Sequence, residues 1–325
     1  ELMKVIEVVK KYAIFVAFIA LLVLFSIASP NFLTVKNFMS VARQASMSGV
    51  ASVGILFVLL LGGIDMSIGS SVSLVCVLCA MLMVNFNVHP LLASLVSILI
   101  ATLVGLVNGF FVSTLGIPAF ISSLAFMRIL SGIAFLISGG MPIYGFSENF
   151  RLLGQGYVGF IPIPVIIMIV CFAIGSFILN QTTFGRYIYA VGGNEEAAKL
   201  SGIQTGTVKY AVYGLSGTFA ALAGLIMLAR LGSGQASAGD GFEFEVITAA
   251  VLGGTSISGG SGKISGVIVG VLFMAFLNNG LVLMNVNAYV QKVIIGCVLL
   301  IAVSFDFIAR RNKKYPKKKL SRFTR

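Results

Sequence analysis

The sequence predicts an all-α protein, a polytopic transmembrane helical bundle of about ten spans with two short or broken helices and an internal repeat. Hydrophobic residues make up 58% of the 325 positions and charged residues only 10%. The mean hydropathy is +1.06, well above that of a soluble domain, which cannot bury so much apolar surface. Apolar sequence runs almost from end to end without a polar domain or a long linker, so we expect a single transmembrane domain over residues 1–325.

The individual spans follow from the length of the apolar windows, because a helix needs roughly 20 apolar residues to cross a bilayer. Two windows, 50–61 and 246–254, are apolar but short, and each runs into glycine-rich polar sequence. The long windows fall at 12–28, 68–86, 90–115, 119–137, 161–179, 210–231, 264–284 and 290–307.

The distribution of basic residues predicts the orientation. An even number of spans places both ends on one side, and both ends are basic: three lysines lie in 1–11 and nine of the 22 basic residues lie in 310–325. Both termini are therefore expected in the cytoplasm, with 308–325 as a basic tail beside anionic lipid rather than a nucleic-acid site. Threading from there makes 180–209 a cytoplasmic loop.

Neither a metal site nor an enzymatic site is expected. Cys76 and Cys79 form a C-x-x-C spacing, but they lie inside an apolar window without histidine or charge nearby, as do Cys171 and Cys297. The spans also lack H-E-x-x-H, paired aspartates and a nucleophile with a base. An intramembrane enzyme is thus a remote alternative.

The two short windows end alike. Residues 61–69 read LGGIDMSIG and residues 252–260 read LGGTSISGG, an offset of 191 residues. Interrupted hydrophobic segments at corresponding places in two halves are typical of a transport site built from broken helices. Chance similarity in a chain with 37 glycines is the alternative. If the span count holds, the repeat is parallel rather than inverted.

These breaks supply the expected translocation path. Asp65 is the acidic residue most clearly at membrane depth, where a charge has to face a cavity, protein or a helix end. With nearby serines it could bind a polyol, or it could simply cap the following helix. Asn278 and Asn279 could touch substrate or form interhelical hydrogen bonds. The expected path residues are Gly62, Gly63, Asp65, Ser67, Gly69, Gly253, Gly254, Thr255, Ser256, Asn278 and Asn279.

The stretch 253–263 is not a phosphate-binding loop. The motif G-x-x-x-x-G-K-[ST] would need glycine at Ile257 and serine or threonine at Ile264. Its glycines instead favour a tight turn and close approach between helices. If the protein uses ATP, another subunit has to bind it.

The interior loop contains a short predicted helix. Asn194 is a good N-cap, Glu195 and Glu196 suit a first turn, and Gly202 can end the helix. The small apolar face of Ala197, Ala198 and Leu200 could fill a partner's groove while the two acids meet basic residues there. An ordinary capped loop helix is the alternative. On the outer side, Asp240, Glu243 and Glu245 precede the second short window and could face a soluble partner or only solvent.

Taken together, these motifs resemble the permease subunits of bacterial ATP-binding-cassette importers for simple sugars, ribose permeases in particular. The resemblance covers nearly the whole chain. It rests on SPNFLT at 29–34, GIDMSIG at 63–69, GRYIYAVGGNEEAAKLSGI at 185–203, VLGGTS at 251–256 and LNNGL at 277–281, which stand in the expected order.

The resemblance implies a transport subunit of the bacterial inner membrane and no covalent chemistry. The chain would carry no cofactor, with ATP and magnesium on a partner ATPase, and an extracytoplasmic sugar-binding protein would deliver the substrate. Two permease copies, expected to be a homodimer, would share the two ATPase domains. The implied coupling loop comprises Gly192, Gly193, Asn194, Glu195, Glu196, Ala197, Ala198, Leu200 and Gly202.

Other substrates and another energy source remain open at this point. Related permeases for galactose, xylose, allose, autoinducer-2 and nucleosides share much of the pattern, so ribose is the first expectation among several. An ion-coupled secondary transporter also uses broken helices, but it would need an acidic or histidine relay, for which only Asp65 qualifies.

Overall fold

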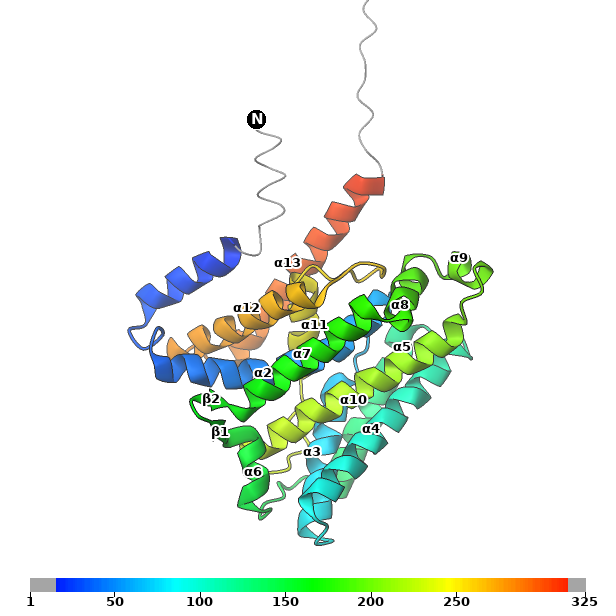
Figure 1. Cartoon of the computed structure of the whole chain (residues 1–325). Coiled ribbons are helices and arrows are strands. Elements are labelled where there is room, and N and C mark those ends of the chain that lie inside the picture. Colours follow the sequence, from blue (N-terminus) through cyan, green and yellow to red (C-terminus); the bar gives the residue numbers. More distant parts are fainter. Residues whose placement is uncertain (1–15, 315–325) are drawn as a thin grey trace, which may run out of the picture.

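The computed structural model describes residues 16–314 (Figure 1). Residues 12–15 of the first window, the N-terminal lysines and the tail after 314 lie outside the described residues. Seven described helices are long and apolar enough to cross a membrane. They are α2 (Val35–Leu60), α4 (Pro90–Ser113), α5 (Ala119–Ser138), α7 (Ile163–Gln181), α10 (Thr205–Leu231), α12 (Ile264–Leu283) and α13 (Ala288–Lys314).

Three shorter helices complete the bundle. The first helix, Val16–Ala28, and α3 (Ile68–Val84) are apolar. The third, α11 (Phe242–Leu252), has 11 residues. These three helices and the seven long ones lie where the ten spans were predicted, and the predicted all-α class is confirmed. That all ten cross the membrane stays a prediction.

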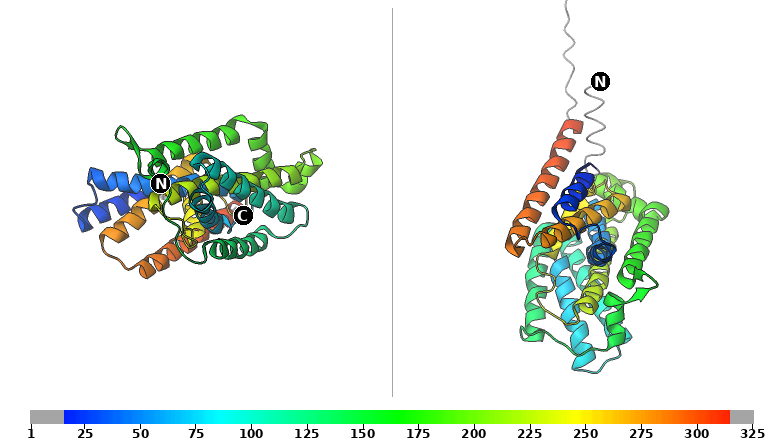
Figure 2. Two further views of the ribbon diagram at one scale, coloured as in Figure 1. Left: turned by 90° about the horizontal axis from the view of Figure 1, so that it is seen from below. Right: turned by 90° about the vertical axis from the view of Figure 1, so that its left-hand side faces the viewer.

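Two helices, α2 and α10, form the centre of the bundle. Buried residues make up 89% of the apolar window of α2 and 78% of that of α10, against 17% for α4 and 6% for α13. Helix α10 packs against α2, α3 and α4, and α2 also packs against α7, α11 and α12. In the right-hand view of Figure 2, α13 (red) runs along one edge. The exposed apolar faces of the outer helices are the surface that lipid or another subunit has to cover.

The prediction that 50–61 is a short helix is wrong. This window is the second half of α2, a helix of 26 residues that begins at Val35, with Thr34 accepting a hydrogen bond from the Asn37 amide. Polar residues in the first half lowered its apparent hydropathy. In the structure several of these side chains face protein, and Ser46 and Ser48 are buried. A central helix tolerates them because neighbouring helices supply partners.

The two glycine-rich breaks follow helices that end in the same way. After α2, Gly62 has a left-handed φ of +80° and the Gly63 amide donates to the Val58 carbonyl over 3.1 Å. After α11, Gly254 has φ +84° and the Thr255 amide donates to the Ala250 carbonyl, also over 3.1 Å. Both are Schellman-type ends, in which glycine adopts the left-handed conformation without strain.

The equivalent positions in the two breaks therefore lie 192 residues apart, one more than the offset read from the letters. The sequence comparison aligned the first glycine of each pair. The backbone instead aligns Gly62 with Gly254, because Leu252 is the last helical residue in the second half and Leu60 in the first. The repeated feature is thus confirmed as a pair of similar helix ends, with a corrected register.

Two polar segments flank the spans. The segment between α5 and α7, predicted to lie on the outer side, contains α6 (Glu148–Gln155) and a hairpin of β1 (Tyr157–Val158) and β2 (Ile161–Pro162), paired antiparallel with Val158 opposite Ile161. The interior loop contains α8 (Thr183–Gly193) and α9 (Glu195–Leu200). The sequence analysis expected only the second of these two loop helices.

The segment between α10 and α11 runs back along α3. A Cβ on Gly234 would lie 2.8 Å from the Cys76 carbonyl oxygen, and the Gly239 amide donates to the Ser73 hydroxyl over 2.9 Å. One turn further along α3, Gly69 and Gly239 contact each other through their backbones. This turn-rich segment therefore enters the bundle before α11 begins.

Candidate functional site

The interior loop forms a capped helix, as expected. The Asn194 side chain accepts a hydrogen bond of 3.0 Å from the Ala197 amide at the start of α9. At the other end Gly202, with φ +82°, follows the C-cap Ser201 and turns the chain toward α10. Figure 1 shows α9 at the tip of the molecule, away from the outer hairpin.

The two faces of α9 differ from the expectation. Glu195 and Ala198, three residues apart, share the inner face, and Ala198 is buried. Glu196 and Leu200 point outward, with 82% of the Glu196 side chain and 90% of Leu200 exposed. Ala198 therefore packs inside the loop and Glu195 is half-buried, whereas Glu196, Ala197 and Leu200 are exposed. That α9 meets a partner stays a prediction.

Glu195 is used inside the loop. Both of its carboxylate oxygens accept hydrogen bonds of 2.7 Å from the Lys209 ammonium group on α10. Partial burial raises the pKa of Glu195, but the hydrogen bond and the charge of Lys209 outweigh burial and lower that pKa below its ordinary value of 4.5. The pair fixes α9 against α10.

The interior loop contacts both breaks at one point, through glycine. A Cβ added to Gly192, at the end of α8, would overlap the Leu60 carbonyl oxygen and lie 2.8 Å from the Gly260 nitrogen. The Gly260 amide itself donates to the Leu60 carbonyl over 2.8 Å. We call Leu60, Gly62, Gly192, Gly259 and Gly260 the glycine junction. It joins α8, the end of α2 and the loop before α12 with no side chain between them.

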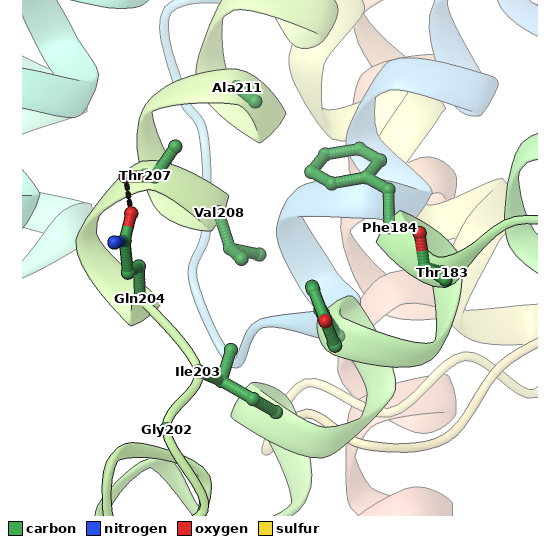
Figure 3. Close-up of a pocket in the computed structure, with 9 residues that line it drawn as sticks. Thr183, Phe184, Gly202, Ile203, Gln204, Thr207, Val208 and Ala211 are labelled. Carbon is green, nitrogen blue, oxygen red and sulfur yellow. Dashed lines mark hydrogen bonds between the residues drawn. The ribbon is translucent and has the colours of Figure 1, made fainter.

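A pocket of about 430 Å³ opens beside the same loop, between α8 and the start of α10 (Figure 3). Phe184, Ile203 and Val208 give it an apolar wall, and the Thr207 hydroxyl donates to the Gln204 side chain at its rim over 3.4 Å. The remaining lining residues are Thr183, Tyr187, Gly202 and Ala211. Leu200 and this pocket together give the loop an exposed apolar surface outside the spans.

Asp65 is fully engaged with protein. One carboxylate oxygen accepts hydrogen bonds from the Ser67 amide and hydroxyl over 3.0 and 2.6 Å, and the other accepts one of 2.8 Å from Ser216 on α10. Ser123 on α5 also donates to the Ile64 carbonyl over 3.0 Å. The structure therefore brings Asp65 and Ser67 together in a turn that holds the link before α3 and leaves Asp65 only 4% exposed. Within the described residues no side chain caps the first amides of α3, so the capping alternative is wrong.

The second break packs tightly on α12. Gly253 contacts Gly266 through the backbone, so its glycine permits the close approach that was expected. Thr255 and Ser256 are completely buried, and the Ser256 hydroxyl accepts a hydrogen bond of 3.0 Å from the Ser258 amide. These residues thus shape the loop, and their place in a translocation path stays a prediction.

Asn278 and Asn279 have different surroundings. Asn279 forms a reciprocal amide pair with Asn37 of α2, at 2.8 and 2.9 Å, which is the interhelical alternative. Asn278 is 7% exposed and its side-chain oxygen has no hydrogen-bond partner. Of the two, only Asn278 therefore has an unpaired side-chain oxygen that could bind a solute.

The three acids around the start of α11, Asp240, Glu243 and Glu245, do not share one outer surface. Asp240 is exposed, but Glu243 is buried against Gly69 at the start of α3, so the expectation that Glu243 faces a soluble partner is wrong. Glu245 lies inside the bundle beside Ser48 and Asn278, within the field of Arg230. The turn-rich segment that runs back along α3 places the first turn of α11, with these two glutamates, inside the bundle.

The sequence analysis missed Arg230 and α8. Arg230 lies near the end of an apolar span, and an ionisable residue in such a place is itself a signal of function. Helix α8 was missed because its glycines and aromatic residues give no helical start signal beyond Thr182.

The family comparison identifies the class of protein. Residues 37–303 match the family described as "branched-chain amino acid transport system / permease component". The chain belongs to this permease family. The permease is accordingly a multi-pass membrane protein and a transport component, as the sequence predicted.

Several curated relatives are similar over almost their whole length. The ribose import permease protein RbsC of Haemophilus influenzae is 42% identical over 90% of this permease and 91% of its own chain. RbsC of Bacillus subtilis is 41% identical over 92% and 93%. The L-arabinose transport system permease protein AraH of Escherichia coli is 38% identical over 94% and 92%. No solved structure matches the permease.

Proposed function

We propose that this permease forms the translocation path of an ATP-driven importer for a simple sugar, with ribose as the substrate. The relatives named as ribose import permeases, at 41 and 42% identity, support ribose over L-arabinose, for which the named relative is 38% identical. Galactose, xylose, allose, autoinducer-2 and nucleosides are the remaining candidates.

One observation supports the coupling role most strongly, namely the glycine junction. An ATPase that moves the interior loop would move Gly192, which contacts the ends of both broken segments without an intervening side chain. Packed backbones transmit displacement because they have no rotamers to absorb it. Binding of the ATPase would thus shift the permease between outward- and inward-facing states, because the ATPase binds the loop with a different affinity in each state.

The partners in this proposal are a cytoplasmic ATPase subunit, an extracytoplasmic sugar-binding protein and a second permease copy. The exposed Glu196, Ala197 and Leu200 of α9 and the adjacent pocket would receive the ATPase. That assignment requires α9 and both termini to be cytoplasmic, which the basic ends of the chain support. ATP and magnesium would bind only to the ATPase.

The test is uptake of labelled ribose into vesicles that contain the permease, its ATPase and the binding protein. We expect uptake to require ATP inside the cytoplasmic compartment, to survive collapse of the proton gradient, and to exceed uptake of L-arabinose and galactose. Uptake by the permease alone, driven by a proton gradient, would identify a secondary transporter instead. Preferential uptake of another sugar would show that ribose is not the substrate, but the proposed ATP-driven mechanism would stand.

A further inference from the structure

A group of polar side chains from four helices meets inside the bundle, away from the glycine junction. Glu245 of α11 lies within hydrogen-bonding reach of Ser48 of α2 and Asn278 of α12, and Arg230 of α10 is near enough to act on its charge. We call these four residues the interior polar cluster. Of the helices that carry them, α2 packs against α10, α11 and α12, and α11 packs against α12.

The cluster is charged at a place where charge is costly. An arginine or glutamate in the interior of a membrane domain is unfavourable by roughly 2.5–3.5 kcal/mol on insertion scales and has to serve a partner, water or solute. Among the described residues, the direct ion pairs lie only in the interior loop around Glu195. Arg230 therefore lies within the electrostatic reach of Arg43 and of Glu245 without an ion pair to Glu245, and both Arg230 and Glu245 are partly exposed.

Hydrogen-bonding capacity in the cluster is left unused. The guanidinium group of Arg230 has one weak protein partner in the described structure, the Met47 sulfur at 3.9 Å. The side-chain oxygen of Asn278, a residue 7% exposed, accepts no hydrogen bond. Buried polar groups are normally satisfied, so a free donor set opposite a free acceptor indicates a missing polar ligand.

These free groups suit a neutral polyol. A sugar hydroxyl both donates and accepts, so it can accept from the guanidinium group and donate to the Glu245 carboxylate or the Asn278 oxygen. Asp65 and Asn279 offer nothing comparable, because their polar atoms are already paired within the protein.

We propose that Arg230, Glu245 and Asn278 bind the hydroxyl groups of the sugar during its passage through the permease. This inference rests on the proposed function, whose substrate class it places at particular residues. Ser48, which is 1% exposed, positions the Glu245 carboxylate from the α2 side.

The test combines variants with sugar analogues, since a lost contact should matter only when the matching hydroxyl is present. Uptake is measured in vesicles with ATPase and saturated binding protein, using ribose and deoxy analogues that each lack one hydroxyl. Glu245→Gln and Asn278→Ala are compared with the wild-type permease. Thr218→Val is the matched control, because it removes a 2.8 Å interhelical hydrogen bond of α10 to Thr102 outside the cluster.

For Glu245→Gln we expect ribose uptake to fall about 10-fold, the value of a hydrogen bond to a charged group. For at least one deoxy analogue, uptake by the variant and uptake by the wild type should differ by less than about 2-fold. Asn278→Ala should show the same pattern with a smaller loss, and Thr218→Val should not distinguish between sugars. An equal loss for every analogue in both cluster variants would overturn the inference. Absence of ATP-driven sugar uptake by the wild type would instead overturn the proposed function.

Discussion

The amide nitrogen of Gly260 lies 2.8 Å from the carbonyl oxygen of Leu60, so the loop before α12 is hydrogen-bonded to the last residue of α2. Gly192 of α8 is inserted at the same place, where only a residue without a side chain fits. This contact makes the coupling proposal testable at the level of single methyl groups.

Gly192→Ala should uncouple ATP hydrolysis from uptake. Its Cβ would overlap the Leu60 carbonyl oxygen, so α8 has to move away from both breaks. We expect sugar uptake per ATP hydrolysed to fall about 10-fold or more, since an overlap with packed backbone costs at least 1–3 kcal/mol. Gly193→Ala is the matched control, because no atom lies within 4 Å of its added Cβ. Equal ratios in the two variants would contradict the junction's role.

Charge-reversal variants should distinguish the roles of the two glutamates of α9, Glu195 and Glu196. Glu196→Lys changes an exposed side chain, so we expect weaker association with the ATPase while the permease stays folded. Glu195→Lys places a second positive charge beside Lys209 and should loosen the loop itself. Association measured by pull-down, together with protease sensitivity of 193–205, distinguishes these effects. Unchanged association in Glu196→Lys would show that α9 does not dock through this face.

The stability of the loop should decline in acid. Because the pKa of Glu195 is lowered in the folded protein, its pairing with Lys209 stabilises the loop above the ordinary glutamate pKa of 4.5 and is lost as pH falls through the lowered value. Thermal unfolding of the wild type and Lys209→Met, compared from pH 7 downward, isolates the pair. We expect the difference between them to shrink below about pH 4.5. If the difference in thermal stability between the wild type and Lys209→Met does not depend on pH, the pairing of Glu195 with Lys209 is not its source.

Loss of the Ser216 hydroxyl should destabilise the permease. Ser216→Ala leaves one Asp65 oxygen without its partner in a buried site, at a cost of about 1–3 kcal/mol in the free energy of unfolding. Ser97→Ala is a suitable control, since this equally buried hydroxyl bonds only to the Ala93 carbonyl of its own helix. Thermal unfolding in detergent measures both, and equal effects would mean that the link between α2 and α3 is not held through Ser216.

The amide pair of Asn37 and Asn279 should behave as one unit. Alanine at either position removes both reciprocal hydrogen bonds, with an expected cost of about 1–2 kcal/mol, and the double variant should cost little more. Unfolding of the two single variants and the double variant provides the cycle. Additive costs, or a loss of uptake confined to Asn279→Ala, would instead place Asn279 in contact with the sugar.

Hydropathy predicted most of the fold because lipid demands continuous apolar helices, and local signals predicted α9 from Asn194 and Gly202. Hydropathy failed to predict the start of α2, because the polar side chain of Asn37 is hydrogen-bonded to Asn279, which lies 242 positions away in the sequence. Such pairing has no local signature. The same limit explains the outer acids: nothing near Glu243 or Glu245 indicates that the preceding segment enters the bundle along α3.

The short length of α11 has a further consequence. Eleven residues give a helix of about 16 Å, roughly half the thickness of the hydrocarbon core, so the non-helical, turn-rich segment 232–241 has to cover the remaining depth. Backbone amides there lack the protection of a continuous helical ladder. Deuterium from bulk solvent should therefore label this stretch far sooner than the flanking helices, which would make the middle of the protein, rather than its rim, the place where solvent first penetrates.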